Sequence, residues 1–155
     1  MTEGVTITPT TADHIRQLVS TLREDDLREI EKWGVSPFKG IWRAYRNSKI
    51  CRSGFVNGRI VAIWGINGSL LGFVGNPWLM TSNVADEYPF VFSMIYRRET
   101  REMLKSYRLL ETFVDSCYAK SIRMLRIAGF KEREFIPTRN GMLLRMEMIG
   151  GAQWH

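Results

Sequence analysis

Basic side chains recur along one segment at a spacing that suits an anionic partner. At i, i+4, i+8 and i+11 of a predicted helix the sequence places Arg97, Arg101, Lys105 and Arg108. This spacing gathers them on one side of the helix, where they could contact phosphate or the acidic surface of a partner. Glu99 and Glu102 stand in the same segment and favour the alternative, a solvated face with local ion pairs.

Other side chains have chemistry that depends on a neighbour. His14 could act as a base, but a lone histidine near a helix start is more typical of a surface or capping residue. Cys117 needs a neighbouring base to become a nucleophile, and the sequence favours a small buried filler. Asp115 either orients a substrate amine or forms a turn. Trp78 is expected in the core or in the wall of a cleft.

The cysteines and the hydropathy pattern restrict the compartment. Cys51 and Cys117 stand far apart and form no CxxC pair, so neither a metal site nor a disulfide framework is predicted. A reducing, cytoplasmic setting is the simplest inference. No apolar run approaches the ~20 residues of a membrane span, and the N-terminus lacks the blocks of a signal peptide. We therefore expect a soluble protein.

Composition points to one globular domain. The 155 residues are 45% hydrophobic and 12% aromatic, which is enough for a real core. Lys and Arg number 22 against 16 Asp and Glu, so the formal charge is +6. That excess favours acidic partners without identifying one. We expect a single domain over residues 1–149, followed by a mobile tail at 150–155 that carries Trp154.

The first half of the chain predicts a strand, two helices and a hairpin. Residues 5–9 alternate as a short strand that ends at Pro9. A helix follows, is interrupted at Asp25 and Asp26, and continues to Gly34. Ser36 then caps a second amphipathic helix. Two strands at 50–56 and 59–64 flank Asn57 and Gly58, the dipeptide favoured in type I′ hairpin turns.

The second half predicts a strand at 77–82, a helix from Pro89 to about Tyr107, a strand at 109–114 and a helix at 121–128. Gly129 and Phe130 read as the stop of that helix. A final strand pair turns around Asn140 and Gly141. The resulting order, β-α-α-β-β-β-α-β-α-β-β, predicts an α/β fold with a mixed, mostly antiparallel sheet and helices on both faces.

The order of elements and two sequence motifs resemble a known family. GNPWLMTSN at residues 75–83 and SIRMLRIAGF at 121–130, within this order, are similar to the Gcn5-related N-acetyltransferase (GNAT) fold over nearly the whole chain. More narrowly they resemble a phage-encoded GNAT-like family that includes the small internal virion protein of short-tailed phages. The resemblance implies acetyl-CoA as a cofactor, if the chain is an enzyme.

In that superfamily, a glycine-rich turn before the long central helix binds the CoA pyrophosphate through backbone N–H groups. The matching segment, SNVADEYP at 82–89, has no glycine and places Asp86 and Glu87 where the phosphates would lie. These carboxylates are expected to satisfy the helix N–H groups that a pyrophosphate would use. If an unusual cofactor mode survives, the resemblance implies the candidates Met80, Ser82, Asn83 and Val84.

The resemblance also implies a tyrosine four residues before the Gly-Phe pair, as general acid for the leaving thiolate. That position is Leu125. An asparagine common in the superfamily corresponds to Tyr118, which with Ser121 is a candidate for proton transfer, and Cys117 lies near the expected acyl cleft. Ile122, Leu125 and Ala128 are expected to form the buried side of this helix.

The missing glycine turn and the missing tyrosine favour a non-catalytic protein. The leading hypothesis is a phage GNAT-fold module that serves as a virion assembly, internal virion or interaction component, located in the virion or in the host bacterial cytoplasm. Its partners would be virion or host proteins, with packaged DNA as a further contact. One alternative is an acetyl-CoA-dependent N-acetyltransferase that modifies a host or phage protein during infection. Another is an effector that binds a host enzyme without chemistry.

Overall fold

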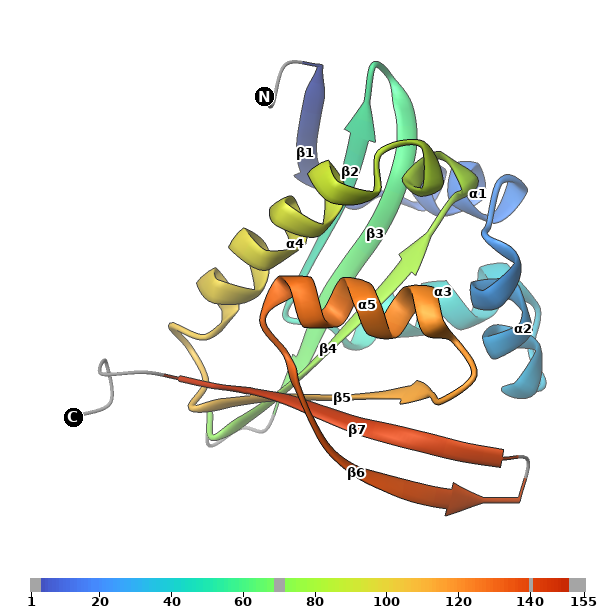
Figure 1. Cartoon of the computed structure of the whole chain (residues 1–155). Coiled ribbons are helices and arrows are strands. Elements are labelled where there is room, and N and C mark those ends of the chain that lie inside the picture. The colour runs from blue at the N-terminus through green and yellow to red at the C-terminus, as the bar shows by residue number, and fades with distance from the viewer. Residues whose placement is uncertain (1–3, 69–71, 140, 151–155) are drawn as a thin grey trace. The chain divides into compact units, whose positions relative to one another are not determined.

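The computed structural model describes residues 4–68, 72–139 and 141–150 (Figure 1). Its strands are β1 (Val5–Pro9), β2 (Ile50–Val56), β3 (Arg59–Gly68), β4 (Val74–Thr81), β5 (Leu109–Asp115), β6 (Lys131–Thr138) and β7 (Gly141–Ile149). Its helices are α1 (Ala12–Ser20), α2 (Glu24–Lys32), α3 (Pro37–Asn47), the 3₁₀ helix η1 (Asn83–Glu87), α4 (Pro89–Met103) and α5 (Ala119–Ala128). The strands form one sheet in the order β1-β2-β3-β4-β5-β7-β6. The predicted α/β class with a mostly antiparallel sheet is confirmed.

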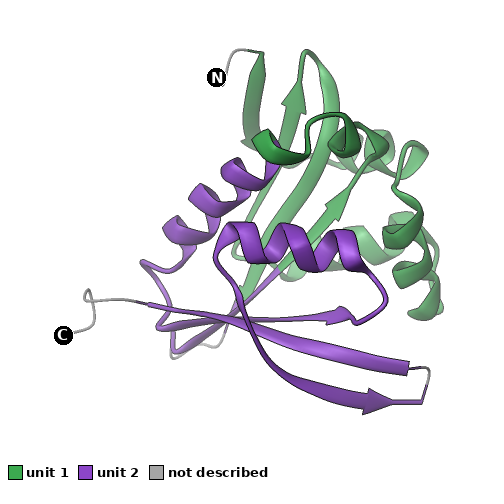
Figure 2. Cartoon of the chain, in the orientation of Figure 1, with its two compact units in different colours: residues 1–67, 78–91 green, residues 68–77, 92–155 purple. Residues whose placement is uncertain are grey.

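The chain divides into two compact units (Figure 2). Unit 1 comprises residues 1–67 and 78–91, and unit 2 comprises residues 68–77 and 92–155. Both β4 and α4 contribute residues to each unit. The single domain expected over residues 1–149 stays a prediction. Most of the expected tail, including Trp154, lies outside the described residues.

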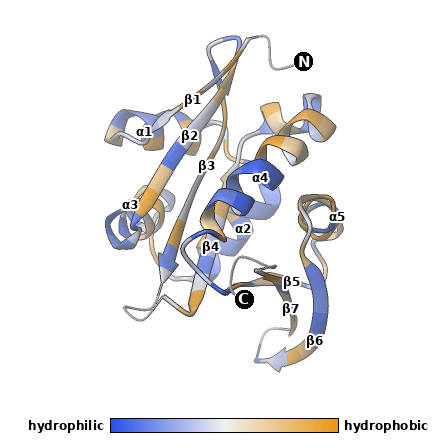
Figure 3. Cartoon of the chain, turned by 90° about the vertical axis from the view of Figure 1, so that its left-hand side faces the viewer, coloured by the Kyte–Doolittle hydropathy of each residue, from blue (hydrophilic) through white to orange (hydrophobic). Residues whose placement is uncertain are grey.

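Unit 1 is built on the β2–β3 hairpin. Asn57 and Gly58 have φ values of 50° and 80°, so both central residues of the turn are left-handed, as a type I′ turn requires. In Figure 3, α1 and α3 lie on one side of β2 and β3. Their buried side chains meet the sheet in one apolar core of Ile15, Leu18, Ile30, Ile41, Ile60, Ile63 and Met80. The predicted hairpin is confirmed.

The region before this hairpin holds one helix more than predicted. The interruption expected at Asp25 and Asp26 is wrong in position, because α1 and α2 are separated around Leu22 and both acids lie in the first turn of α2. Leu22 pairs in an isolated bridge with Ser82, and the Arg23 N–H donates to the Thr81 carbonyl oxygen at 2.9 Å. A continuous helix would lose both bonds. Pairing with a distant strand end therefore overrides the local helical pattern.

Unit 2 contains the antiparallel strands β5, β7 and β6. β7 pairs with β5 from Leu109↔Ile149 to Asp115↔Leu143, and with β6 from Lys131↔Glu147 to Thr138↔Gly141. Side chains alternate along β7, and Leu144, Met146 and Met148 are buried. Met142 is exposed, and the turn residue Asn140 lies outside the described residues. β6 is exposed along its length and mostly hydrophilic (Figure 3).

The two helices of unit 2 end differently from one another. α5 stops as predicted, because Gly129 has φ 116° and the Phe130 N–H donates to the Leu125 carbonyl oxygen at 2.9 Å. Ile122, Leu125 and Ala128 form its buried side, as expected. The prediction that α4 reaches Tyr107 is wrong, since the helix ends at Met103 and a turn follows.

Candidate functional site

The loop that precedes α4 lies entirely in unit 1 and is a 3₁₀ helix with its own cap. The Ser82 hydroxyl accepts a hydrogen bond from the Val84 N–H at 3.1 Å and donates to the Ile60 carbonyl oxygen at 2.6 Å. Pro89 then opens α4 in the position where a missing N–H costs nothing. The N–H groups of the next residues in a helix's first turn have no partner within the helix. They are therefore suited to an anion.

Both acids of this loop are bound to arginines from other elements of unit 1. Glu87 accepts hydrogen bonds from both terminal nitrogens of Arg59, at 3.0 and 2.7 Å. These bonds hold the pKa of Glu87 below its ordinary value. Asp86 pairs with Arg23 at 3.4 Å. The two acids that the sequence places at the helix start are therefore each compensated by an arginine from outside the loop.

The sequence alone did not predict that Arg23 and Arg59 pair with these acids. They stand 63 and 28 residues away from the acids they bind. The local segment contains no basic residue, so its composition suggested a negative loop. Arg23 lies in the α1–α2 turn and Arg59 lies on β3. They reach the acids only once these two segments have folded next to the end of β4.

A buried carboxylate fixes the same corner of unit 1. Asp26, the third residue of α2, accepts hydrogen bonds from the Thr81 N–H at 2.8 Å and the Thr81 hydroxyl at 2.5 Å. Its side chain is 8% exposed, and burial raises its pKa although Thr81 and Arg23 act against that shift. Arg23 Nε lies 3.9 Å from Asp26. Asp26 therefore joins α2 to the last residue of β4.

The cofactor candidates have different exposures. Met80 belongs to the apolar core of unit 1, so only its backbone groups are suited to a ligand. Ser82 is fully buried and bonded on both sides, and Val84 is buried as well. Asn83 alone of the four exposes its side chain, while its N–H donates to the Thr21 carbonyl oxygen at 3.0 Å. The loop would thus meet a ligand through Asn83 and backbone groups.

In unit 2, the parallel ladder between β4 and β5 is short. Its register contains two pairs, Val74↔Leu109 and Gly75↔Leu110. At the next residue the hydrogen bond to β5 comes from a side chain and not from the backbone. The Asn76 side-chain amide donates to the Glu111 carbonyl oxygen at 3.2 Å. Pro77 then lacks an N–H altogether. The sequence Asn-Pro therefore ends the parallel pairing after two pairs.

The catalytic candidates Cys117, Tyr118 and Ser121 lie together at the start of α5, in unit 2. Tyr118 is the N-cap residue and is buried, whereas Ser121 is half-buried. Cys117 is exposed, so the expectation of a buried filler is wrong. The Cys117 N–H donates to the Asp115 carboxylate at 2.9 Å, which is the turn-forming role expected as one alternative for Asp115.

His14 and Trp78 have structural roles in unit 1. The Thr11 N–H donates to His14 Nδ1 at 3.2 Å, and the Thr11 hydroxyl accepts from the His14 N–H, which completes a capping box. His14 Nδ1 also lies 3.0 Å from the Ser53 hydroxyl. The capping interpretation is confirmed. Trp78 packs against the core and donates through Nε1 to Ser48 at 2.6 Å.

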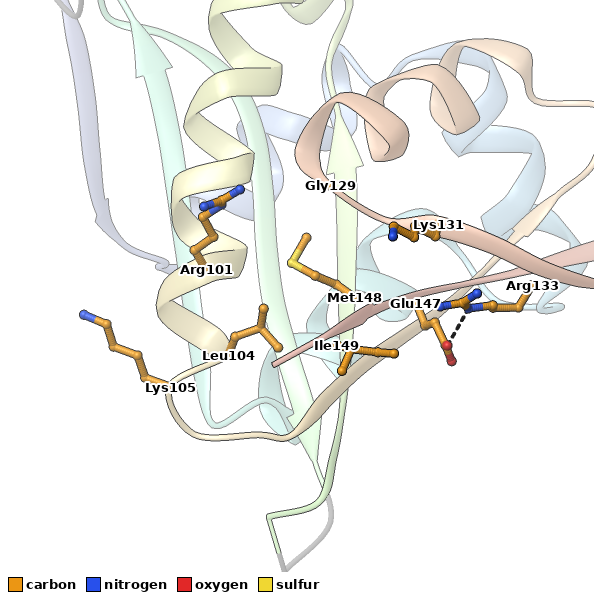
Figure 4. Close-up of a pocket in the computed structure, with 9 residues that line it drawn as sticks. All are labelled: Arg101, Leu104, Lys105, Gly129, Lys131, Arg133, Glu147, Met148 and Ile149. Atoms are coloured by element: carbon orange, nitrogen blue, oxygen red, sulfur yellow. Dashed lines mark hydrogen bonds and ion pairs between the residues drawn. The ribbon is translucent and has the colours of Figure 1, made fainter. Parts of the chain in front are cut away.

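The predicted cationic stripe does not continue as one helix face. Arg97 and Arg101 lie on α4, but Lys105 lies in the turn after it. Arg108 lies beyond that turn, where its guanidinium stacks on Phe73 at 5.0 Å. Arg101 and Lys105 instead line a cavity in unit 2 with two cations that the sequence analysis missed, Lys131 and Arg133 (Figure 4). Both lie on β6, where the register shifts between Glu132 and Glu134, so the regular alternation of a strand does not predict their placement.

The described residues, 4–68, 72–139 and 141–150, include neither a metal site nor a membrane-spanning helix. No group of three or more His, Cys, Asp or Glu side chains among them could hold a metal ion. None of their helices is long and apolar enough to cross a membrane.

Comparison with known proteins identifies the fold. No protein-family model matches the chain, and no curated protein matches its sequence. The aminoglycoside acetyltransferase AAC(6')-Ib in complex with paromomycin and acetyl-CoA is 15% identical with a TM-score of 0.69, over 94% of this chain and 93% of that chain. The spermidine N-acetyltransferase from Vibrio cholerae in complex with CoA and spermine is 12% identical with a TM-score of 0.72, over 99% of both chains.

These likenesses confirm the GNAT fold, while a phage-specific family is not shown. They contradict the leading hypothesis of a non-catalytic virion or interaction component, because the similar structures are acetyltransferases with CoA or acetyl-CoA bound. The physical argument for that hypothesis also fails at Asp86 and Glu87, whose charges are compensated by arginines.

Proposed function

We propose that this chain is an acetyl-CoA-dependent N-acetyltransferase that acts on a primary amine. The likeness in fold to CoA-bound acetyltransferases extends over nearly the whole chain. The observation that carries the proposal is the pairing of Glu87 with Arg59 and of Asp86 with Arg23. Because the acids are engaged there, the start of α4 is suited to the cofactor's pyrophosphate.

The proposed cofactor contacts follow from what each residue has to offer. Phe90 and Val91 supply first-turn N–H groups of α4, since Pro89 has none. Asn83, at the start of η1, adds an exposed carboxamide. Arg23 and Arg59 compensate the negative charges of Asp86 and Glu87 in the same loop. Together these groups replace the glycine-rich turn by a loop whose geometry is fixed by Ser82 and by ion pairs.

Acetyl-CoA would supply an acetyl thioester: the amine nitrogen would bond to its carbonyl carbon and give up a proton to solvent, while the C–S bond would break and the sulfur would take a proton from solvent. The backbone N–H of Met80 is proposed to donate to the carbonyl oxygen.

Acetyl transfer tests the proposal directly. The protein is incubated with acetyl-CoA and, in turn, kanamycin, spermidine and a lysine-containing peptide, and each amine is analysed by mass spectrometry for one added acetyl group. We expect enzyme-dependent acetylation of at least one amine. Hydrolysis of acetyl-CoA without acetylation of any amine counts against an N-acetyltransferase.

A further inference from the structure

Unit 2 holds a cavity of about 530 Å³ that none of the proposed acetyl-transfer residues lines (Figure 4). Cavities of this size are typical of small-molecule sites. Its lining comes from the end of α4 and the turn after it, from the α5 stop, and from the paired strands β6 and β7. The residues are Arg101, Leu104, Lys105, Gly129, Lys131, Arg133, Glu147, Met148 and Ile149.

Positive charge dominates this lining. Arg101 and Lys105 come from α4 and the turn after it, and Lys131 and Arg133 come from β6 (Figure 4). The acidic lining residue, Glu147, binds Arg133 at 2.5 Å and also Arg145 at 3.0 Å. Although burial favours its neutral form, the hydrogen bonds and charges of these two arginines lower the pKa of Glu147. Glu147 is therefore ionised and already compensated.

The cations differ in how far the protein itself compensates them. Arg133 is engaged by Glu147, and Lys105 forms an exposed pair with Glu102 at 3.0 Å, a type of pair that contributes little. Within the described part of the chain, neither Arg101 nor Lys131 has a carboxylate partner. These two side chains are thus left for an external anion.

The floor of the cavity is apolar. Leu104 and Met148 are 8% exposed each, and Ile149 is 61% exposed beside them. Gly129 keeps this floor open, since a Cβ there would lie 3.1 Å from Met148 Cε. A ligand that fills the cavity would therefore contact cations at its edge and aliphatic surface beneath.

We propose that this cavity binds a small phosphomonoester. Its phosphate contacts Arg101 and Lys131, and its apolar body lies on Leu104, Met148 and Ile149. A phosphomonoester carries ~1.5 to 2 negative charges at neutral pH, which matches more than one cation, and arginine binds phosphate through paired N–H groups. The proposal does not depend on acetyl transfer, because none of the residues proposed to bind acetyl-CoA lines this cavity.

The test uses naphthyl phosphate as probe, with inorganic phosphate and naphthol as its separated halves. In protein carrying isotope-labelled methionine methyl groups, we expect naphthyl phosphate to shift the Met148 methyl resonance saturably. The exposed Met94 on α4 does not line the cavity and serves as the internal control. Naphthol and inorganic phosphate should bind at least ~10-fold more weakly, because each lacks one half of the recognition.

Variants locate the site. The double substitution Arg101→Gln, Lys131→Gln should weaken naphthyl phosphate binding by ~10-fold or more. Arg98→Gln is the matched control, since Arg98 is an exposed arginine on the same helix outside the cavity. Equal binding of naphthol, or equal affinity in the double variant and wild type, overturns the proposal. An unmoved Met148 resonance at millimolar naphthyl phosphate also overturns it. If the double variant at the same time loses binding to a DNA duplex, the cations of the cavity serve a nucleic acid and not a small phosphomonoester.

Discussion

Whether the loop before α4 repels an anion depends on whether its acidic residues are paired with arginines. Glu87 alone would do so, but the two hydrogen bonds from Arg59 turn the pair into a neutral unit. Such an exposed pair contributes little to stability. Its importance lies in the local potential at the start of α4, where an anion would bind.

Removing one charge of this pair should change acetyl-CoA affinity, and removing both should restore it. Arg59→Gln leaves Glu87 uncompensated, so we expect the Kd for acetyl-CoA to rise by roughly three- to tenfold at low salt. The double variant Arg59→Gln, Glu87→Gln should return most of the lost affinity. Titration calorimetry at two ionic strengths measures both effects.

The control breaks an exposed pair elsewhere in unit 1. Arg28 binds Glu24 one turn away on α2, so Arg28→Gln removes the same kind of charge. We expect no change in acetyl-CoA affinity for this variant. If Arg59→Gln and Arg28→Gln behave alike, the loop charges do not act on the cofactor.

The two cysteines should differ in reactivity. Cys117 is exposed, whereas burial raises the pKa of the half-buried Cys51 to about 11. The thiolate is the reactive form, so iodoacetamide at a pH near 8 should label Cys117 well before Cys51. Mass spectrometry of peptides from the native protein measures the two rates. Equal rates in the native protein, with equal rates also after denaturation, would contradict the placement of Cys51.

At the scale of elements, one buried carboxylate joins a helix to a strand end. Asp26 on α2 accepts both the N–H and the hydroxyl of Thr81 on β4. Asp26→Ala would leave the buried Thr81 N–H without this acceptor, so we expect a loss of ~1 to 3 kcal/mol in the free energy of unfolding. Asp26→Asn retains an acceptor oxygen and should cost less. Asp25→Ala, at the neighbouring acid, should cost at most ~1 kcal/mol.

The raised pKa of Asp26 gives this prediction a pH dependence. The folded protein binds a proton at Asp26 more tightly than the unfolded chain, so protonation favours folding. The stability of wild type relative to Asp26→Asn should therefore rise as pH falls through the folded pKa, and become constant below the unfolded value near 3.8. Urea denaturation at several pH values measures the difference. A difference that instead falls with decreasing pH would mean that the folded pKa is lowered.

Elements with local signals were predictable from the sequence, and those set by distant contacts were not. Asn57 and Gly58 define the hairpin, and Gly129 defines the end of α5, because positive φ restricts the residue type. The α1–α2 boundary was predicted a few residues too late, at Asp25 and Asp26, because its position depends on the pairing of Leu22 with Ser82, far along the chain. The same reason hid the arginine partners of the loop acids. A segment can look anionic in sequence and be neutral in the fold.

At the scale of the whole molecule, element order was enough to predict the fold class, since strand and helix patterns are strong signals. Function was not predictable from the same information. The leading hypothesis treated the missing glycine turn as evidence against a cofactor, but backbone N–H groups at a helix start do not require glycine to bind an anion. The Asn-Pro pair at Asn76 and Pro77 was a further local indication of structure in the sequence, because it ends the parallel pairing of β4 with β5.

Binding of acetyl-CoA to the intact protein tests the central claim most directly. If the native state binds it, a hundredfold excess over the dissociation constant should add ~2.7 kcal/mol to the free energy of unfolding and raise Tm. Desulfo-CoA should do so too, whereas acetate should not, because the pyrophosphate provides the contact. An unchanged Tm at millimolar acetyl-CoA would contradict the proposal that this chain is an acetyltransferase.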